Sequence, residues 1–153
     1  MDVKLINPFI DATLNVLETM AFTKAKAGKP YVKGDKVARG DVSGLIGLTG
    51  EASGAVAVSF TETSILSIVS NMFGEEVKEM NEEIKDAVGE ITNMISGQAR
   101  QKLEELGRSL KAAIPVVIMG KNHSLTHVTT HHIIAIPFGT DSGEFTVEVS
   151  FEQ

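Results

Sequence analysis

A long periodic stretch at residues 81–107 limits the possible folds more than any other part of the sequence. It reads NEEIKDAVGEITNMISGQARQKLEELG. At about 100° per residue on a helix, its apolar side chains fall along one stripe. That stripe is expected to contain Ile84, Val88, Ile91, Ile95 and Leu106. Gly107 follows as a typical helix stop, so the stretch predicts one long amphipathic helix.

The opposite face of this predicted helix carries polar side chains between two glycines. Asn93 lies nearly opposite the apolar stripe, and Asp86 and Glu90 precede it on the same outward side. Gly89 and Gly97 flank Asn93, one helical turn away on either side. Each glycine costs a helix interior roughly 1 kcal/mol relative to alanine. We therefore expect a face that another backbone approaches closely; the alternative is an ordinary polar surface.

A repeated pentapeptide indicates an internal duplication. V-A-V-S-F occupies residues 56–60 and V-E-V-S-F occupies residues 147–151. Each ends a predicted β-hairpin whose turn contains Ser-Gly, and each hairpin follows a predicted helix. We therefore expect an α+β fold with one domain over residues 1–153. Its mostly antiparallel sheet would be packed by long helices on one face, with two helix-plus-hairpin units related by a pseudo-twofold axis.

The remaining elements are predicted from local signals. Asn7-Pro8 predicts a helix that starts at Pro8 and runs to residue 21, and Thr61 predicts the cap of another helix that ends near Phe73. Glycines at 44, 47, 50 and 54 match no phosphate-binding loop, so we expect them to let a helix pack closely. The other predicted segments are a loop or short edge strand at 23–40, a hairpin at 41–60 with its turn near 50–53, a buried strand at 114–119, a polar loop at 121–130, a strand at 131–138, a turn at 140–143 and a half-buried strand at 145–151.

Composition excludes several functional classes. The chain of 153 residues has no cysteine, which removes disulfides and thiolate chemistry. A formal net charge of −6 without a basic stripe argues against nucleic-acid binding. No apolar run approaches the roughly 18 residues of a membrane span, and the first residues lack the apolar core of a signal peptide. We therefore expect a cytoplasmic protein that binds neither nucleic acid nor membrane.

Four histidines at 123, 127, 131 and 132 raise the possibility of a zinc site. His123, His127 and His131 would align on one face of a helix or a strand. No carboxylate lies between Gly120 and Gly139 to orient the rings, so a structural role is the stronger hypothesis and no metal site is predicted. Zinc in the purified protein would support the alternative.

An amide and a carboxylate on an exposed helix restrict the possible chemistry. The Asn93 amide oxygen can accept a hydrogen bond from water without charge, whereas a carboxylate there would repel a phosphate. Holding water in line with the scissile bond speeds phosphoryl transfer. Glu90 could bind a cation on the molecule that carries the phosphate. The pair would form half of an active site, and the partner would supply the phosphoryl group, the metal and the charge neutralisation.

These residues resemble the signature of the CheC, CheX and FliY phosphatases of bacterial chemotaxis. In that family an Asp or Ser is followed by Glu and Asn at the spacing of Asp86, Glu90 and Asn93, and Pro115 follows at about the family's distance. The segments INPFIDATLNVLETM, GKPYVK and GDVSGLIGLTGEASGAVAVSF are similar to CheX segments, so the resemblance covers nearly the whole chain. CheC-type members carry a second Glu-x-x-Asn in the first helix; here DATLN, at 11–15, is out of register, so one site is expected.

The resemblance implies that the chain dephosphorylates the aspartyl phosphate of a CheY-like response regulator. Asn93 would place the attacking water and Glu90 would pair with the regulator's active-site lysine. Asp86, Gly89 and Gly97 would contact the partner. The regulator would supply Mg²⁺, so no cofactor of the chain's own is expected, and family members are typically homodimers. An alternative with the same fold is a non-catalytic CheC-like module that docks response regulators or flagellar switch proteins.

Overall fold

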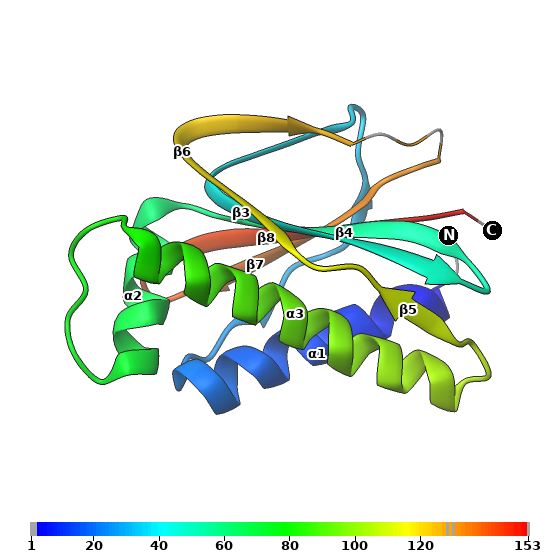
Figure 1. The fold of residues 1–153 in the computed structure, drawn as a ribbon, viewed down its shortest axis with the longest axis horizontal. Coiled ribbons are helices and arrows are strands. Elements are labelled where there is room, and N and C mark those ends of the chain that lie inside the picture. The colour runs from blue at the N-terminus through cyan, green and yellow to red at the C-terminus, as the bar shows by residue number, and fades with distance from the viewer. Residues whose placement is uncertain (1–2, 128, 130, 153) are drawn as a thin grey trace.

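Long helices cover one face of an antiparallel sheet in the computed structural model, which describes residues 3–127, 129 and 131–152 (Figure 1). The helices are α1 Val3–Ala21, α2 Glu62–Phe73 and α3 Glu82–Glu105. The strands are β1 Lys26–Ala27, β2 Tyr31–Val32, β3 Val37–Gly50, β4 Ser53–Phe60, β5 Leu110–Ala112, β6 Val116–Thr126, β7 Ile134–Thr140 and β8 Gly143–Glu152. The predicted α+β class is confirmed. Within the described residues no helix is long and apolar enough to cross a membrane.

The sheet is built from two hairpins that meet along β4 and β8. Its strand order is β1-β7-β8-β4-β3-β5, with β2 paired to β7 and β6 paired to β3. All of these pairings are antiparallel. α1 and α3 pack against each other under the sheet and run in opposite directions (Figure 1). The hairpins β3–β4 and β7–β8 turn where the sequence predicts.

The register of β4 and β8 agrees with the predicted duplication. Val56 lies opposite Val149, and Val58 lies opposite Val147. Exchanging the two pentapeptides residue by residue converts the first of these pairs into the second. The ladder therefore maps onto itself when the two halves are exchanged, as a local twofold axis between the hairpins requires.

The apolar stripe of α3 differs from the prediction at its end. Ile84, Val88, Ile91 and Ile95 are buried as expected, but Leu106 is 59% exposed and Leu103 is buried instead. Gly107 adopts φ +88°, and the Arg108 N–H returns to the Leu103 carbonyl at 2.8 Å. Leu106 is thus the cap residue, where the chain already leaves the helical path.

The first helix begins earlier than predicted. α1 starts at Val3 and contains Pro8, whereas the Asn7-Pro8 signal placed the start at Pro8. Leu5 and Ile6 are buried in the core, and burying each contributes about 1.5–3 kcal/mol. Together these contributions, about 3–6 kcal/mol, match or exceed the roughly 3 kcal/mol that an interior proline costs a helix. Tertiary packing therefore extends the helix toward the N-terminus, past the Asn7-Pro8 signal that predicted its start.

A strand does form within 114–119, from Val116 onward, but its predicted burial is wrong, and so is the predicted polar loop at 121–130. One strand, β6, spans Val116–Thr126 and pairs with β3. Ile114 is 87% exposed and Val116 is 57% exposed. The register between β3 and β6 shifts at a bulge between Gly40 and Val42. Beyond this bulge, the C-terminal part of β6 pairs with the N-terminal part of β3, and both curve away from the sheet (Figure 1). Positions 128 and 130 of the expected loop lie outside the described residues.

The side of β8 that faces away from the helices is also buried at Glu148, rather than exposed. Glu148 is only 3% exposed, although alternation predicted an outward side chain. Its Oε1 lies 2.8 Å from His127 Nε2, and its Oε2 lies 3.1 Å from Lys33 Nζ. Chain segments from before β3 and after β6 therefore cover this face, and they bring partners for the buried carboxylate.

Candidate active site on the outer face of α3

Local signals set both ends of α2 and the start of α3, the helix that carries the site. Thr61 caps α2, with its Oγ1 accepting from the Ser64 N–H, and Gly74 ends α2 at φ +69°, as predicted. Asn81 caps α3 by accepting from the Ile84 N–H at 3.1 Å. The acids that follow Asn81 in the first turn favour the positive end of the helix dipole.

A close contact between α3 and β3 sets the position of the helical turn that carries Asn93. Thr92 is fully buried, and its Oγ1 donates to the Val88 carbonyl at 2.7 Å. A Cβ on Gly44 of β3 would lie 1.9 Å from Thr92 Oγ1. The absence of a side chain at Gly44 lets the helix rest directly on the strand. As the sequence indicated, this glycine serves close packing.

Asp86, Glu90 and Asn93 are all exposed on the outer face of α3. In the part of the chain that the structure describes, none of these three side chains has a hydrogen-bond or ion-pair partner. A carboxylate and an amide without internal partners can bind groups of another molecule without first breaking contacts of their own. The face is therefore polar and exposed, as the helical spacing predicted.

Neither glycine on this face is required by the chain's own packing. A Cβ on Gly89 would lie 3.4 Å from Val117 Cγ2, which is an ordinary contact, and so Gly89 borders β6. A Cβ on Gly97 would have Arg100 Nη2, at 3.9 Å, as its nearest neighbour. Alanine, the better helix former, would fit at both positions. Because the fold itself does not need glycine at these positions, the two glycines support the expectation that another molecule approaches here.

Sequence reasoning did not single out Arg100. It lies seven residues after Asn93, which returns it to the same side of the helix to within about 20°. The side chain is half-buried, and its Nε donates a long hydrogen bond of 3.4 Å to Ser96 Oγ. Following the face of Asn93 for two more helical turns, past Gly97, would have identified this residue from the sequence.

α1 borders the site and is held to α3 by polar contacts. Asn15 Nδ2 donates to Gln98 Oε1 at 2.8 Å, and Lys102 Nζ lies 3.2 Å from Asp11 Oδ2. Asp11 and Asn15 are the residues of the out-of-register pattern in the first helix. Both are engaged with α3, and they do not form a second free acid–amide pair.

His123 and His127, two of the histidines that the sequence singled out, have separate partners. His123 contacts Ser43 Oγ through Nε2 and the Gly120 carbonyl through Nδ1, each at 2.8 Å. His127 contacts the buried Glu148. Within the described residues, no three His, Asp or Glu side chains are grouped so that they could hold a metal ion.

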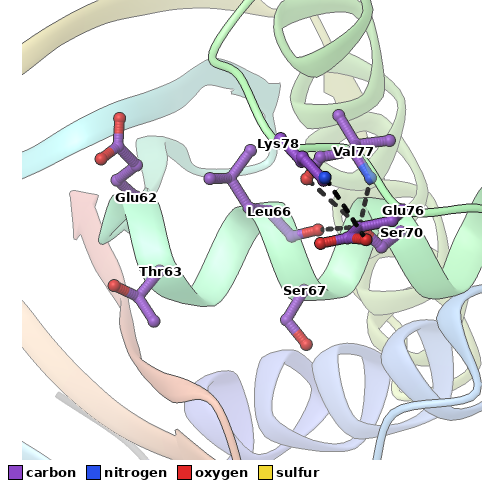
Figure 2. Close-up of a pocket in the computed structure, with 8 residues that line it drawn as sticks. All are labelled: Glu62, Thr63, Leu66, Ser67, Ser70, Glu76, Val77 and Lys78. Atoms are coloured by element: carbon purple, nitrogen blue, oxygen red, sulfur yellow. Dashed lines mark hydrogen bonds and ion pairs between the residues drawn. The ribbon is translucent and has the colours of Figure 1, made fainter.

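A shallow pocket of about 500 Å³ lies along α2 and the connector that follows it (Figure 2). Ser70 Oγ at its wall accepts from the Val77 N–H at 2.8 Å and donates to the Leu66 carbonyl at 2.6 Å. These bonds join the α2–α3 connector to α2. The lining residues are Glu62, Thr63, Leu66, Ser67, Ser70, Glu76, Val77 and Lys78. The pocket includes no residue of the predicted site.

The fold and the exposed Glu-x-x-Asn helix define the class of CheC-like chemotaxis proteins. The family model described as "Chemotaxis phosphatase CheX" matches residues 42–139. The chain belongs to the CheX family, which makes it a phosphatase. The CheY-P phosphatase CheX of Thermotoga maritima is 29% identical over 123 residues, covering 80% of this chain and 79% of that protein.

Solved structures extend the similarity over nearly the whole chain. CheX from Desulfovibrio desulfuricans has a TM-score of 0.93 at 48% identity and covers 97% of this chain and 99% of that one. CheX in a CheX–CheY–BeF₃–Mg²⁺ complex from Borrelia burgdorferi has a TM-score of 0.81 at 27% identity, with 97% and 98% coverage.

Proposed function

We propose that this chain hydrolyses the aspartyl phosphate of a CheY-like response regulator. The observation that carries the proposal is the exposed face of α3, on which Glu90 and Asn93 have no partner among the described residues. Two relatives support the choice of substrate. The Thermotoga maritima protein is named a CheY-P phosphatase, and the Borrelia burgdorferi CheX was crystallised with CheY.

In the proposed reaction, Asn93 orients the attacking water. The amide oxygen accepts a hydrogen bond from the water, whose oxygen then attacks the phosphorus. The bond between phosphorus and the aspartyl oxygen breaks, giving inorganic phosphate and a free carboxylate. A neutral amide suits this position because it brings no negative charge toward the phosphoryl oxygens.

Glu90 is proposed to pair with the active-site lysine of the regulator. The carboxylate lies one turn before Asn93 on the same face, so one docking pose can engage both residues. Asp86, Gly89 and Gly97 complete the proposed contact surface. Negative charge on this face favours a partner that presents a lysine.

The regulator is proposed to supply the Mg²⁺ of the reaction. The related Borrelia burgdorferi complex contains Mg²⁺ together with BeF₃ and CheY. The catalytic residues proposed for this chain are one amide and one carboxylate, which are too few to hold a metal alone. The chain's own contribution is therefore to place water and to orient the partner.

We further propose that residues 1–153 act as one CheX-like domain, in the cytoplasm and as a homodimer. Support for the dimer comes from family resemblance and from β6, an edge strand that pairs with β3 alone among the described residues. An edge strand offers unpaired backbone groups to a second copy. Light scattering that gave a monomer mass at micromolar concentration would contradict the dimer.

The function is tested by phosphate release from a phosphorylated CheY-like regulator in Mg²⁺. The wild-type chain is expected to accelerate release, and Asn93→Ala is expected to lower the rate about 100-fold or more while leaving the folded structure unchanged. Glu90→Ala is expected to weaken regulator binding, while Glu105→Ala, at an exposed helix end, serves as the control. Binding without any acceleration by the wild-type chain would favour the non-catalytic docking module.

A further inference from the structure

The guanidinium of Arg100 folds back along α3 toward Asn93. Its Nη2 lies 3.9 Å from the place where a Cβ on Gly97 would be. Gly97 is one helical turn beyond Asn93, or about 6 Å along the axis. Long side chains on a helix lean toward its N-terminus, and the missing side chain at Gly97 leaves room for this one. A cationic group thus lies about one helical turn from the exposed amide.

Arg100 has no ionic partner within the described chain. Its side chain makes a 3.4 Å hydrogen bond to Ser96 Oγ, and no carboxylate of a described residue lies within ion-pair distance. Glu104 lies four residues further along the same helix, at a spacing that permits an ion pair, yet none forms. In a chain with a net charge of −6, this half-buried arginine keeps most of its donors unused.

We infer that Arg100 binds anionic oxygens of the phosphorylated regulator, an inference that rests on the proposed function. A guanidinium presents its N–H groups as a planar fork that matches carboxylate or phosphoryl oxygens. Partial burial strengthens such a contact because the group is already partly removed from water. The ligand is therefore an anionic group next to the regulator's phosphorylation site.

Arg100 makes the proposed regulator-binding face of α3 asymmetric in charge along the helix. Glu90 and Arg100 lie on opposite sides of Asn93 along the helix, so an acidic side chain precedes the amide and a basic one follows it. A regulator docked in the productive direction places its lysine at Glu90 and its anionic group at Arg100. The reversed direction brings like charges together, which selects against it. Arg100 is thus a specificity-determining residue of the site.

The test measures regulator binding and phosphate release for wild type, Arg100→Ala and Arg100→Lys. Arg100→Ala is expected to raise Kd and KM about tenfold, with kcat nearly unchanged, because a charge-assisted contact is lost. Arg100→Lys is expected to recover part of the affinity, since the charge remains without the fork. Arg108→Ala is the matched control; it removes the same charge beyond the end of α3 and is expected to behave as wild type.

Two binding arms distinguish the source of the anion. If Arg100→Ala weakens binding only to the regulator loaded with BeF₃⁻ and Mg²⁺, the contact is with the phosphoryl group. An equal effect on the unloaded regulator assigns the contact to carboxylates of its surface. The advantage of wild type over Arg100→Ala should shrink with added salt in either case.

Equal Kd values for wild type and Arg100→Ala in both arms would overturn the inference, and so would a loss of kcat at unchanged KM. Neither result would affect the proposed function, which depends on acceleration by wild type and its loss in Asn93→Ala. Conversely, a wild-type chain that fails to release phosphate removes the proposed function. Circular dichroism confirms that each variant is folded before the comparison.

Discussion

Thr92 of α3 occupies the space that a side chain at Gly44 of β3 would need. This contact sets the height of the helix above the sheet, and Asn93 is the next residue along the helix. The position of the proposed water-binding amide therefore depends on a glycine that is distant in the sequence and buried beneath the helix.

Gly44→Ala is expected to lower both stability and activity. A methyl group at this position would lie 2.9 Å from Thr92 Cβ as well as 1.9 Å from Oγ1, so α3 must move outward. We expect the free energy of unfolding to fall by roughly 1–3 kcal/mol, as for other overpacked cores, and phosphate release to slow with it. Gly47→Ala on the same strand is the control because no atom lies within 4 Å of its added Cβ. Equal urea midpoints for the two variants would contradict the packing account.

Asn93→Asp tests the requirement for a neutral side chain. The substitution keeps the size of the residue and adds a negative charge toward the phosphoryl group. Because like charges repel, we expect weaker binding to the regulator loaded with BeF₃⁻ than Asn93→Ala shows, but similar binding to the unloaded regulator. Isothermal calorimetry of both states measures this difference. If Asn93→Asp binds both states as Asn93→Ala does, the residue does not face the phosphoryl group.

Asp41 is expected to make stability depend on acidic pH. Its carboxylate accepts from the N–H groups of Asn122, at 2.9 Å, and Glu62, at 2.7 Å, and these bonds hold the pKa of Asp41 below its ordinary value. The resulting stabilisation is present above the unfolded-state pKa of about 3.9 and is lost as pH falls through the lower folded-state pKa. In Asp41→Ala, stability should be lower near neutral pH and should change less with acid. Glu79→Ala, at an exposed position, is the control; denaturation from pH 6 to 2 checks the slopes.

Removing the Glu148 carboxylate should destabilise the far face of the sheet. His127 and Lys33 both contact it, and Glu148→Ala leaves His127 Nε2 without this acceptor and Lys33 with only Asp35 and the Val37 carbonyl. Breaking a buried pair from one side typically costs about 3–5 kcal/mol. Chemical denaturation measures the loss, which Glu148→Gln should reduce because it retains shape and hydrogen bonding. Phosphate release per folded molecule should stay unchanged, since the group lies on the other face of the sheet from α3. A mutant as stable as wild type would show that the buried cluster contributes nothing.

The sequence predicted best where local chemistry decides the structure. The ends of α2 follow from Thr61 and Gly74, whose cap geometries need no distant partner. The outward direction of Asn93 follows from helical periodicity alone. The family resemblance, confirmed by the family match, also rests on residues at fixed local spacing.

Errors arose where distant segments outweighed local preference. Pro8 lies inside a helix because upstream residues reach the core, and residues 121–126 form a strand because β3 is available for pairing. The position of the Arg100 side chain depends on the empty space at Gly97 and on Ser96, so composition did not reveal it. Burial of Glu148 likewise required His127 and Lys33 to converge from two separate segments.

The pairing of β4 with β8 has a consequence at the middle of the ladder. Ala57 and Glu148 are the second residues of the two pentapeptides, and they lie opposite each other. A perfectly repeated chain would put identical side chains face to face here, and two glutamates would repel each other in a dry interior. An alanine facing a single acid avoids this conflict, so the centre of the repeat is the place where its halves have to differ.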